Sequence, residues 1–78
     1  MGKGRAGILF FRHEGWLARA RRVSGGYANA QMLDEASRTW IDVPTADVIF
    51  YGTPLTIEEA RETCRLRRLS ESVLYEGL

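Results

Sequence analysis

The sequence predicts a small α+β domain in which an antiparallel sheet packs against a C-terminal helix. Three observations lead to this expectation: an apolar N-terminal stretch able to fold back as a β-hairpin, a later run of strand-forming residues, and a helix-capping motif at residues 56–59. The chain has 78 residues, enough for one domain. We therefore expect one domain over residues 1–78, with the glycine-rich residues 1–7 as a flexible lead-in.

The N-terminal hairpin is predicted from two apolar stretches, residues 6–13 and 16–23, joined by Glu14-Gly15 as a two-residue turn. In this register Phe11 lies opposite Ala18, and directly opposed residues share one side of a sheet. A shift by one residue would place arginines among the apolar side chains, so the pattern favours this register. The resulting apolar face is assigned to the core: Leu9, Phe11, Trp16, Ala18 and Ala20.

The opposite face of the hairpin alternates arginine with large apolar residues, which are groups suited to binding a partner. Arginine makes planar, bidentate contacts with carboxylates and phosphates. We expect this face to be accessible to solvent; the predicted partner-binding residues are those of this face, together with the adjacent Arg22: Phe10, Arg12, Leu17, Arg19, Arg21 and Arg22. The alternative is that another layer of the domain covers the apolar part of this face and leaves the arginines at its rim.

The middle of the chain predicts a short helix followed by two strands. Residues 28–38 place Met32, Leu33 and Ala36 at helical spacing. Residues 39–43 and 47–51 are rich in strand formers and are separated by Pro44-Thr45. The second of these runs has no polar alternation, so we expect a buried central strand. Together with the hairpin and the first residue of the C-terminal helix, it gives the predicted core residues Leu9, Phe11, Ile49, Phe50 and Ile57.

The C-terminal helix is predicted to begin after Thr56, because Thr56-Ile57-Glu58-Glu59 matches a capping box. Acidic residues occupy its first turns and arginines its end, which complements the helix dipole. Its inward stripe is formed by Ile57, Ala60 and Cys64. The acidic side, a second surface on which a partner could dock, carries Glu58, Glu59 and Glu62.

Charge is unevenly distributed along a chain whose formal net charge is +1. Residues 1–26 carry six basic and one acidic side chain, whereas residues 27–64 carry two basic and seven acidic ones. This polarity is compatible with docking on a charged partner. Nucleic acid binding is less favoured, because affinity for phosphates depends on an excess of positive charge.

Catalytic and metal chemistry find little support in the sequence. The one histidine, His13, stands beside the predicted turn, where we expect it to be solvated, and Cys64 lies on an inward helix stripe. Asp42 and Asp47 match no metal-binding loop. Residues 2–7 match G-x-G-x-x-G but precede a strand rather than follow one, so no nucleotide site is predicted. We therefore expect no enzymatic activity, cofactor or metal.

The cellular compartment is predicted from the single cysteine and the lack of a long apolar run. One thiol cannot form an intramolecular disulfide, which favours a reducing environment. The apolar run at residues 8–11 is too short for a signal peptide or a membrane span. We expect a cytoplasmic protein without membrane contacts.

The function that these observations favour is non-enzymatic binding to a larger protein or complex, as an accessory factor, regulator or inhibitor. Stand-alone domains of this kind include regulators encoded by phages and mobile elements. The alternative is a nucleic-acid-binding module that uses the basic hairpin. A homo-oligomer built through the hairpin edge or the C-terminal helix is a third hypothesis.

Overall fold

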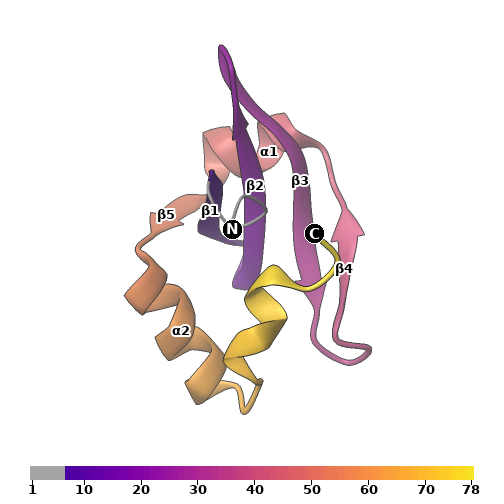
Figure 1. The fold of residues 1–78 in the computed structure, drawn as a ribbon, viewed down its shortest axis with the longest axis vertical. Helices are drawn as coiled ribbons and strands as arrows, with labels where there is room; N and C mark the ends of the chain where they lie inside the picture. Colours follow the sequence, from indigo (N-terminus) through magenta and orange to yellow (C-terminus); the bar gives the residue numbers. More distant parts are fainter. Residues whose placement is uncertain (1–6) are drawn as a thin grey trace.

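A five-stranded antiparallel sheet with helices on both faces forms the fold of residues 7–78, which are the residues described by the computed structural model (Figure 1). The strand order is β4-β3-β2-β1-β5. The predicted α+β class is confirmed. The lead-in and the glycine motif, apart from Gly7, lie outside the described residues. The elements are β1 (Ile8–His13), β2 (Trp16–Val23), β3 (Gly26–Asp34), β4 (Thr39–Asp42), α1 (Thr45–Tyr51), β5 (Thr53–Leu55), α2 (Ile57–Leu66) and the 3₁₀ helix η1 (Glu71–Tyr75).

The N-terminal hairpin has the register that the sequence predicts. Phe11 pairs with Ala18, and His13 pairs with Trp16 next to the turn. Glu14 and Gly15 have φ angles of 52° and 82°, the left-handed pair that a two-residue type I′ turn requires. Both hairpin strands are interior, because β1 also pairs with β5 and β2 also pairs with β3. An oligomer through a free hairpin edge is therefore ruled out by the topology, and that expectation is wrong.

The predicted middle helix at residues 28–38 is wrong, because this segment forms most of β3 and the turn that follows it. Met32 pairs with Ala18 of β2 on one side and with Ile41 of β4 on the other. A helix of this length is marginal in isolation, whereas a central strand gains a ladder on both sides. The helical spacing of Met32, Leu33 and Ala36 therefore did not determine the structure, and the segment pairs as a strand instead.

The predicted strand at residues 47–51 is also wrong, because Thr45–Tyr51 forms α1. A short apolar run without alternation is compatible with either element. In the helix only Val48 is buried, and Phe50, expected in the core, is 78% exposed. Gly52 ends α1 by donating its N–H to the carbonyl of Val48 at 2.8 Å. A Cβ at position 52 would lie 2.4 Å from that oxygen, so glycine is required there.

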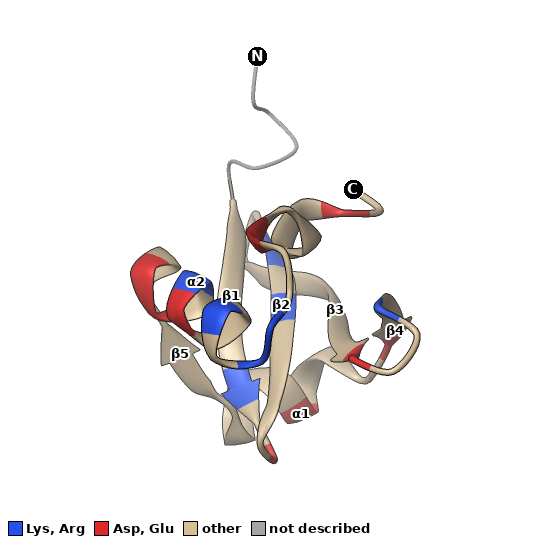
Figure 2. Cartoon of the chain, turned by 90° about the horizontal axis from the view of Figure 1, so that it is seen from below, with Lys and Arg blue, Asp and Glu red and all other residues tan. Residues whose placement is uncertain are grey.

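Two apolar layers flank the sheet. Helices α2 and η1 cover one face, which Figure 2 shows with α2 in front of the strands, and α1 lies against the opposite face. The core prediction holds for Phe11, whereas Leu9, Ile49 and Ile57 are partly buried. The layer under α2 and η1 is the larger: Ile8, Phe10, Leu17, Leu33, Ala60, Cys64, Leu69, Val73 and Leu74. The layer under α1 consists of Phe11, Ala18, Ala20, Ala30 and Val48.

Helix α2 has the predicted start. Thr56 Oγ accepts a hydrogen bond from the N–H of Glu59 at 3.0 Å, and the N–H of Thr56 donates to Glu59 Oε1 at 2.8 Å. Two donors that the first helical turn leaves without partners are thereby satisfied. Ala60 and Cys64 are buried on the inward stripe. Among residues 7–78, no helix is long and apolar enough to cross a membrane.

Candidate functional site

The arginine face of the hairpin is largely covered, so the expectation that all of it is accessible is wrong. Phe10, Leu17 and Arg19 are each 3% exposed or less. They belong to the layer beneath α2 and η1, where the ring of Phe10 meets Tyr75 edge-on at 5.6 Å between centroids. The reason is that the chain returns after α2 and places η1 across this face. These three side chains cannot touch a partner unless that layer opens.

Arg19 holds η1 against the sheet. Its Nη1 donates to the carbonyl of Leu74 at 2.9 Å, and its Nη2 donates to the carbonyl of Glu76 at 2.6 Å. Nε donates to Gln31 Oε1 at 2.9 Å, and the guanidinium lies 4.1 Å from the ring centroid of Trp40. Burial, with the charge of Arg21 adding to it, lowers the pKa of Arg19 to about 10, which leaves the group charged at neutral pH. Its role is therefore structural.

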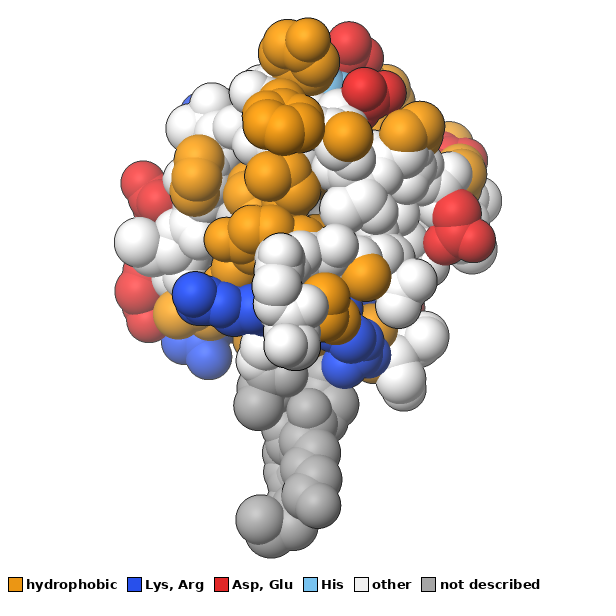
Figure 3. Space-filling view, turned by 90° about the horizontal axis from the view of Figure 1, so that it is seen from above, with side chains coloured by type: hydrophobic (Ala, Val, Ile, Leu, Met, Phe, Trp, Pro, Cys, Tyr) orange, Lys and Arg blue, Asp and Glu red, His pale blue; other side chains and the backbone are white. Residues whose placement is uncertain are grey.

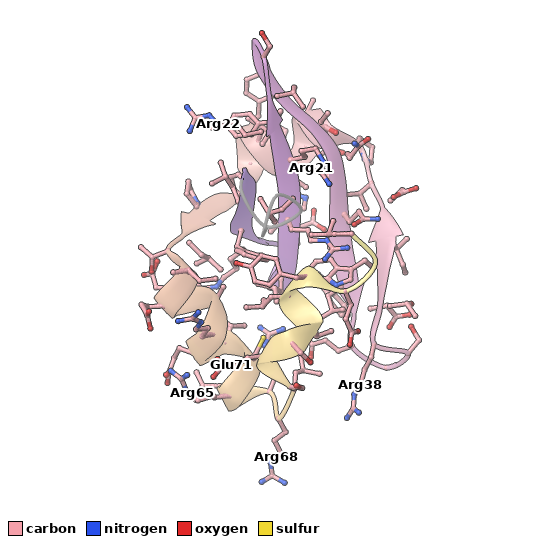
Figure 4. All side chains as sticks on the ribbon, in the orientation of Figure 1. Arg21, Arg22, Arg38, Arg65, Arg68 and Glu71 are labelled. Carbon is pink, nitrogen blue, oxygen red and sulfur yellow. The ribbon has the colours of Figure 1, made fainter. Side chains whose placement is uncertain are left out.

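The remaining arginines of the predicted site do not form one surface. Arg12 is exposed near the β1–β2 turn, whereas Arg21 and Arg22 lie toward the other end of β2. Arg21 is partly buried and Arg22 is exposed, and the two side chains lie on opposite sides of β2 (Figure 4). The structure therefore separates the charges that the sequence pattern had grouped.

The acidic side of α2 is neutralised by its own arginines. Glu58 pairs with Arg61 at 3.2 Å, and Glu62 pairs with Arg65 at 2.6 Å. Arg65 also reaches Glu71 of η1 at 2.8 Å, and Figure 4 shows these two labelled side chains together. Glu59 serves the helix cap. These contacts leave little net negative charge to attract a basic partner.

His13 is buried rather than solvated, which corrects the sequence expectation. As the last residue of β1 it alternates with Phe11 toward the face that carries α1, and it is only 9% exposed. Its Nδ1 atom has no hydrogen-bond partner among the described residues. Asp42 accepts a hydrogen bond from Gln31 Nε2 at 2.9 Å. Within residues 7–78, no group of three or more His, Cys, Asp or Glu side chains is placed to hold a metal ion.

Cys64 is fully buried, as the inward stripe predicts. Burial, followed by the charges of Glu71 and Glu35, raises the pKa of its thiol above the ordinary 9.0. Because the thiolate is the reactive form, the native thiol is expected to be inert.

We predict that a thiol reagent labels Cys64 only as fast as the protein unfolds. The folded state retains the thiol proton at pH values where the unfolded chain loses it. The contribution of the Cys64 thiol to the free energy of unfolding is therefore fully present below pH 9.0. This contribution is lost as the pH rises through the raised pKa that the thiol has in the folded protein. The measurement is the labelling rate against urea concentration at neutral pH. Fast labelling of the native protein would contradict the burial.

Among residues 7–78, the two most exposed large apolar side chains lie on α1. Phe50 is 78% exposed and the adjacent Tyr51 is 77% exposed. On a seven-residue helix that buries only Val48, both rings stand outside the core. Seen from above, hydrophobic side chains form a band across the molecule (Figure 3). The sequence analysis missed this pair because it placed residues 47–51 in a buried strand.

An apolar groove lies on the same side, beyond the part of the sheet that α1 covers. It has a volume of about 220 Å³ and offers mostly apolar surface. Met32 and Val43 belong both to this groove and to the layer under α1, so the groove continues that layer to the surface. At its open end Trp16 is 44% and Ile41 is 49% exposed. The groove is lined by Trp16, Met32, Leu33, Asp34, Ile41 and Val43.

Acidic side chains border this apolar side. Asp34 lines the groove, Glu14 precedes Trp16 in the β1–β2 turn, and Asp47 lies in the first turn of α1. None of the three forms an ion pair within residues 7–78. We call the combination of Phe50, Tyr51, the groove and these three carboxylates the α1 surface.

Comparison with known proteins adds no further information on the site: no protein-family model, no curated protein and no solved structure matches the chain.

Proposed function

We propose that this protein is a non-enzymatic binding domain that docks on a larger protein through the α1 surface. The observation that carries the proposal is the pair of aromatic side chains, Phe50 and Tyr51, which are more than three-quarters exposed on a short helix. Exposed apolar patches with polar rims mark sites of protein association. Aromatic residues are also enriched among those that dominate binding energy.

The partner that fits this surface presents apolar side chains flanked by lysine or arginine. The groove, at about 220 Å³, has room for one or two large apolar side chains. The unpaired carboxylates of Glu14, Asp34 and Asp47 would attract basic residues at the rim and speed association. Such a domain would act as an accessory factor, regulator or inhibitor. The reduced, buried Cys64 supports a cytoplasmic location as part of the same proposal.

Nucleic acid binding through the hairpin has weaker support. That hypothesis needs apolar or aromatic side chains interleaved with arginines on one accessible face. Phe10 and Leu17 lie beneath η1 and α2, and the accessible arginines are dispersed. We therefore keep protein docking as the first proposal.

Site-directed crosslinking tests this proposal. A photoreactive phenylalanine analogue at position 51 is expected to capture a protein from nuclease-treated extract of the source cells. The same analogue at Arg68, an exposed position after α2 that Figure 4 shows pointing away from the domain, serves as the matched control. Capture at position 51 should be lost with a Phe50→Ser substitution. Equal capture at both positions, or capture that nuclease abolishes, would contradict the proposal.

A further inference from the structure

The two edges of the sheet differ in their ability to accept another strand. Strand β5 forms one edge, is three residues long and contains Pro54, which has no N–H to donate. Strand β4 forms the other edge and reads Thr-Trp-Ile-Asp, with no proline or lysine. Natural edge strands are usually protected by such residues. Strand β4 is therefore the open edge of the sheet.

The outward backbone groups of β4 are defined by its pairing with β3. The N–H of Val43 donates to the carbonyl of Ala30 at 3.1 Å, on the β3 side. Alternate residues of an antiparallel strand direct their N–H and C=O groups to opposite sides. Those of Trp40 and Asp42 consequently point away from β3, toward solvent. Within residues 7–78, β4 has β3 as its only strand neighbour.

We propose that two copies of this chain pair through β4 into a two-fold symmetric dimer, with Trp40 of each copy opposite Trp40 of the other. In this antiparallel register the backbone N–H and C=O groups that point away from β3 in one copy face those of the other copy. Arg38 closes the turn before β4, where its N–H donates to the carbonyl of Asp34, and β4 ends in Asp42. The two-fold axis therefore brings the Arg38 side chain of each copy beside Asp42 at the end of the other copy's strand. Neighbouring side chains of unlike charge stabilise paired strands. The edge is therefore complementary to itself, as a two-fold interface must be.

The charges needed for this pairing are accessible. Arg38 is exposed, makes no ion pair within residues 7–78 and extends away from the domain in Figure 4. Asp42 is exposed and is oriented by Gln31, which donates to its Oδ1 at 2.9 Å. Trp40 and Asp42 alternate to one face of β4. Arg38, in the turn before β4, lines a pocket of that face together with Trp40 and Gln31, and Gln31 donates to Asp42, so both charged groups belong to the same face of the sheet.

The other face of β4 adds apolar contact. Ile41 is 49% exposed and opens into the apolar groove beside Met32 and Trp16. In the proposed register the Ile41 residues of both copies are diagonal neighbours, roughly 7–8 Å apart. A four-residue edge buries less than the roughly 1,200 Å² typical of a stable interface. The dimer is therefore expected to dissociate on dilution.

Analytical ultracentrifugation over a wide concentration range tests the pairing. The parent chain should shift from monomer toward twice the chain mass as its concentration rises. The two-fold axis creates two equivalent contacts between residue 38 of one copy and residue 42 of the other. Arg38→Asp alone, or Asp42→Arg alone, places like charges together at both contacts and should weaken dimerisation by about tenfold or more. The double variant Arg38→Asp/Asp42→Arg should restore it. Arg22→Asp and Arg68→Asp make the same charge change at exposed positions away from β4 and should have little effect.

Two further variants connect the result to β4 itself. Ile41→Lys introduces an edge lysine and should abolish dimerisation while circular dichroism stays unchanged. Phe50→Ser, on α1, should leave dimerisation intact, which separates this proposal from docking through the α1 surface. A chain that is monomeric at every concentration would overturn the proposal. A dimer insensitive to both charge reversals, or lost with Phe50→Ser, would also overturn it.

Discussion

Replacing Phe11 with alanine is expected to lower the free energy of unfolding by about 3–5 kcal/mol, as for other buried phenylalanines. Phe11 is 5% exposed and lies in the layer between the sheet and α1. A chain of 78 residues has a thin core, so we expect this loss to leave much of the variant unfolded. Urea denaturation followed by circular dichroism measures the change.

Phe50→Ala is the matched control, because it removes the same side chain from a position that is 78% exposed. Its effect on the free energy of unfolding should stay within about 0.5 kcal/mol. Equal destabilisation by the two substitutions would mean that residues 47–51 form a buried strand after all. It would also remove the basis for the α1 surface.

Arg19→Ala is expected to destabilise the fold by about 3 kcal/mol or more. The substitution leaves the carbonyls of Leu74 and Glu76 without their donor and opens a cavity beside Trp40. Each buried group left unsatisfied costs about 1–3 kcal/mol. Arg19→Lys should recover only part of this, because an ammonium group lacks the planar fork that serves two carbonyls and stacks on an indole.

Arg22→Ala tests whether burial is responsible for that loss. Arg22 is exposed and forms no ion pair within residues 7–78, so its removal should change stability by less than about 0.5 kcal/mol. The measurement is again urea denaturation. An Arg19→Ala variant as stable as Arg22→Ala would contradict the role of Arg19 in holding η1.

The elements that the sequence predicted are those determined by neighbouring residues. The hairpin register follows from the turn at Glu14-Gly15 and from side chains a few positions away. The start of α2 follows from contacts between Thr56 and Glu59. Both are local interactions, which a sequence pattern records directly.

The elements that were missed depend on contacts distant in the chain. Arg19 is buried by carbonyls that lie 55 and 57 positions further along, which no local pattern reveals. The apolar run at residues 48–51 is too short to distinguish a strand from a helix. Its misassignment concealed the exposed pair Phe50 and Tyr51. Phe10 and Leu17 were expected to be exposed for a different reason, because no local pattern shows that α2 and η1 cover that face of the hairpin. Arg12 and Arg22 remain exposed, as expected.

The affinity for the crosslinked partner tests the central claim most directly. Two variants should be compared with the parent chain by titration calorimetry: Phe50→Ser/Tyr51→Ser on the α1 surface and Arg12→Ala/Arg22→Ala on the hairpin. We predict that the first loses roughly 30-fold or more in affinity, because truncating an aromatic anchor commonly costs about 2 kcal/mol. The second should change affinity by less than about threefold, since isolated exposed charges contribute little. If the arginine variant instead loses binding while the aromatic variant binds normally, the α1 surface is not the docking site.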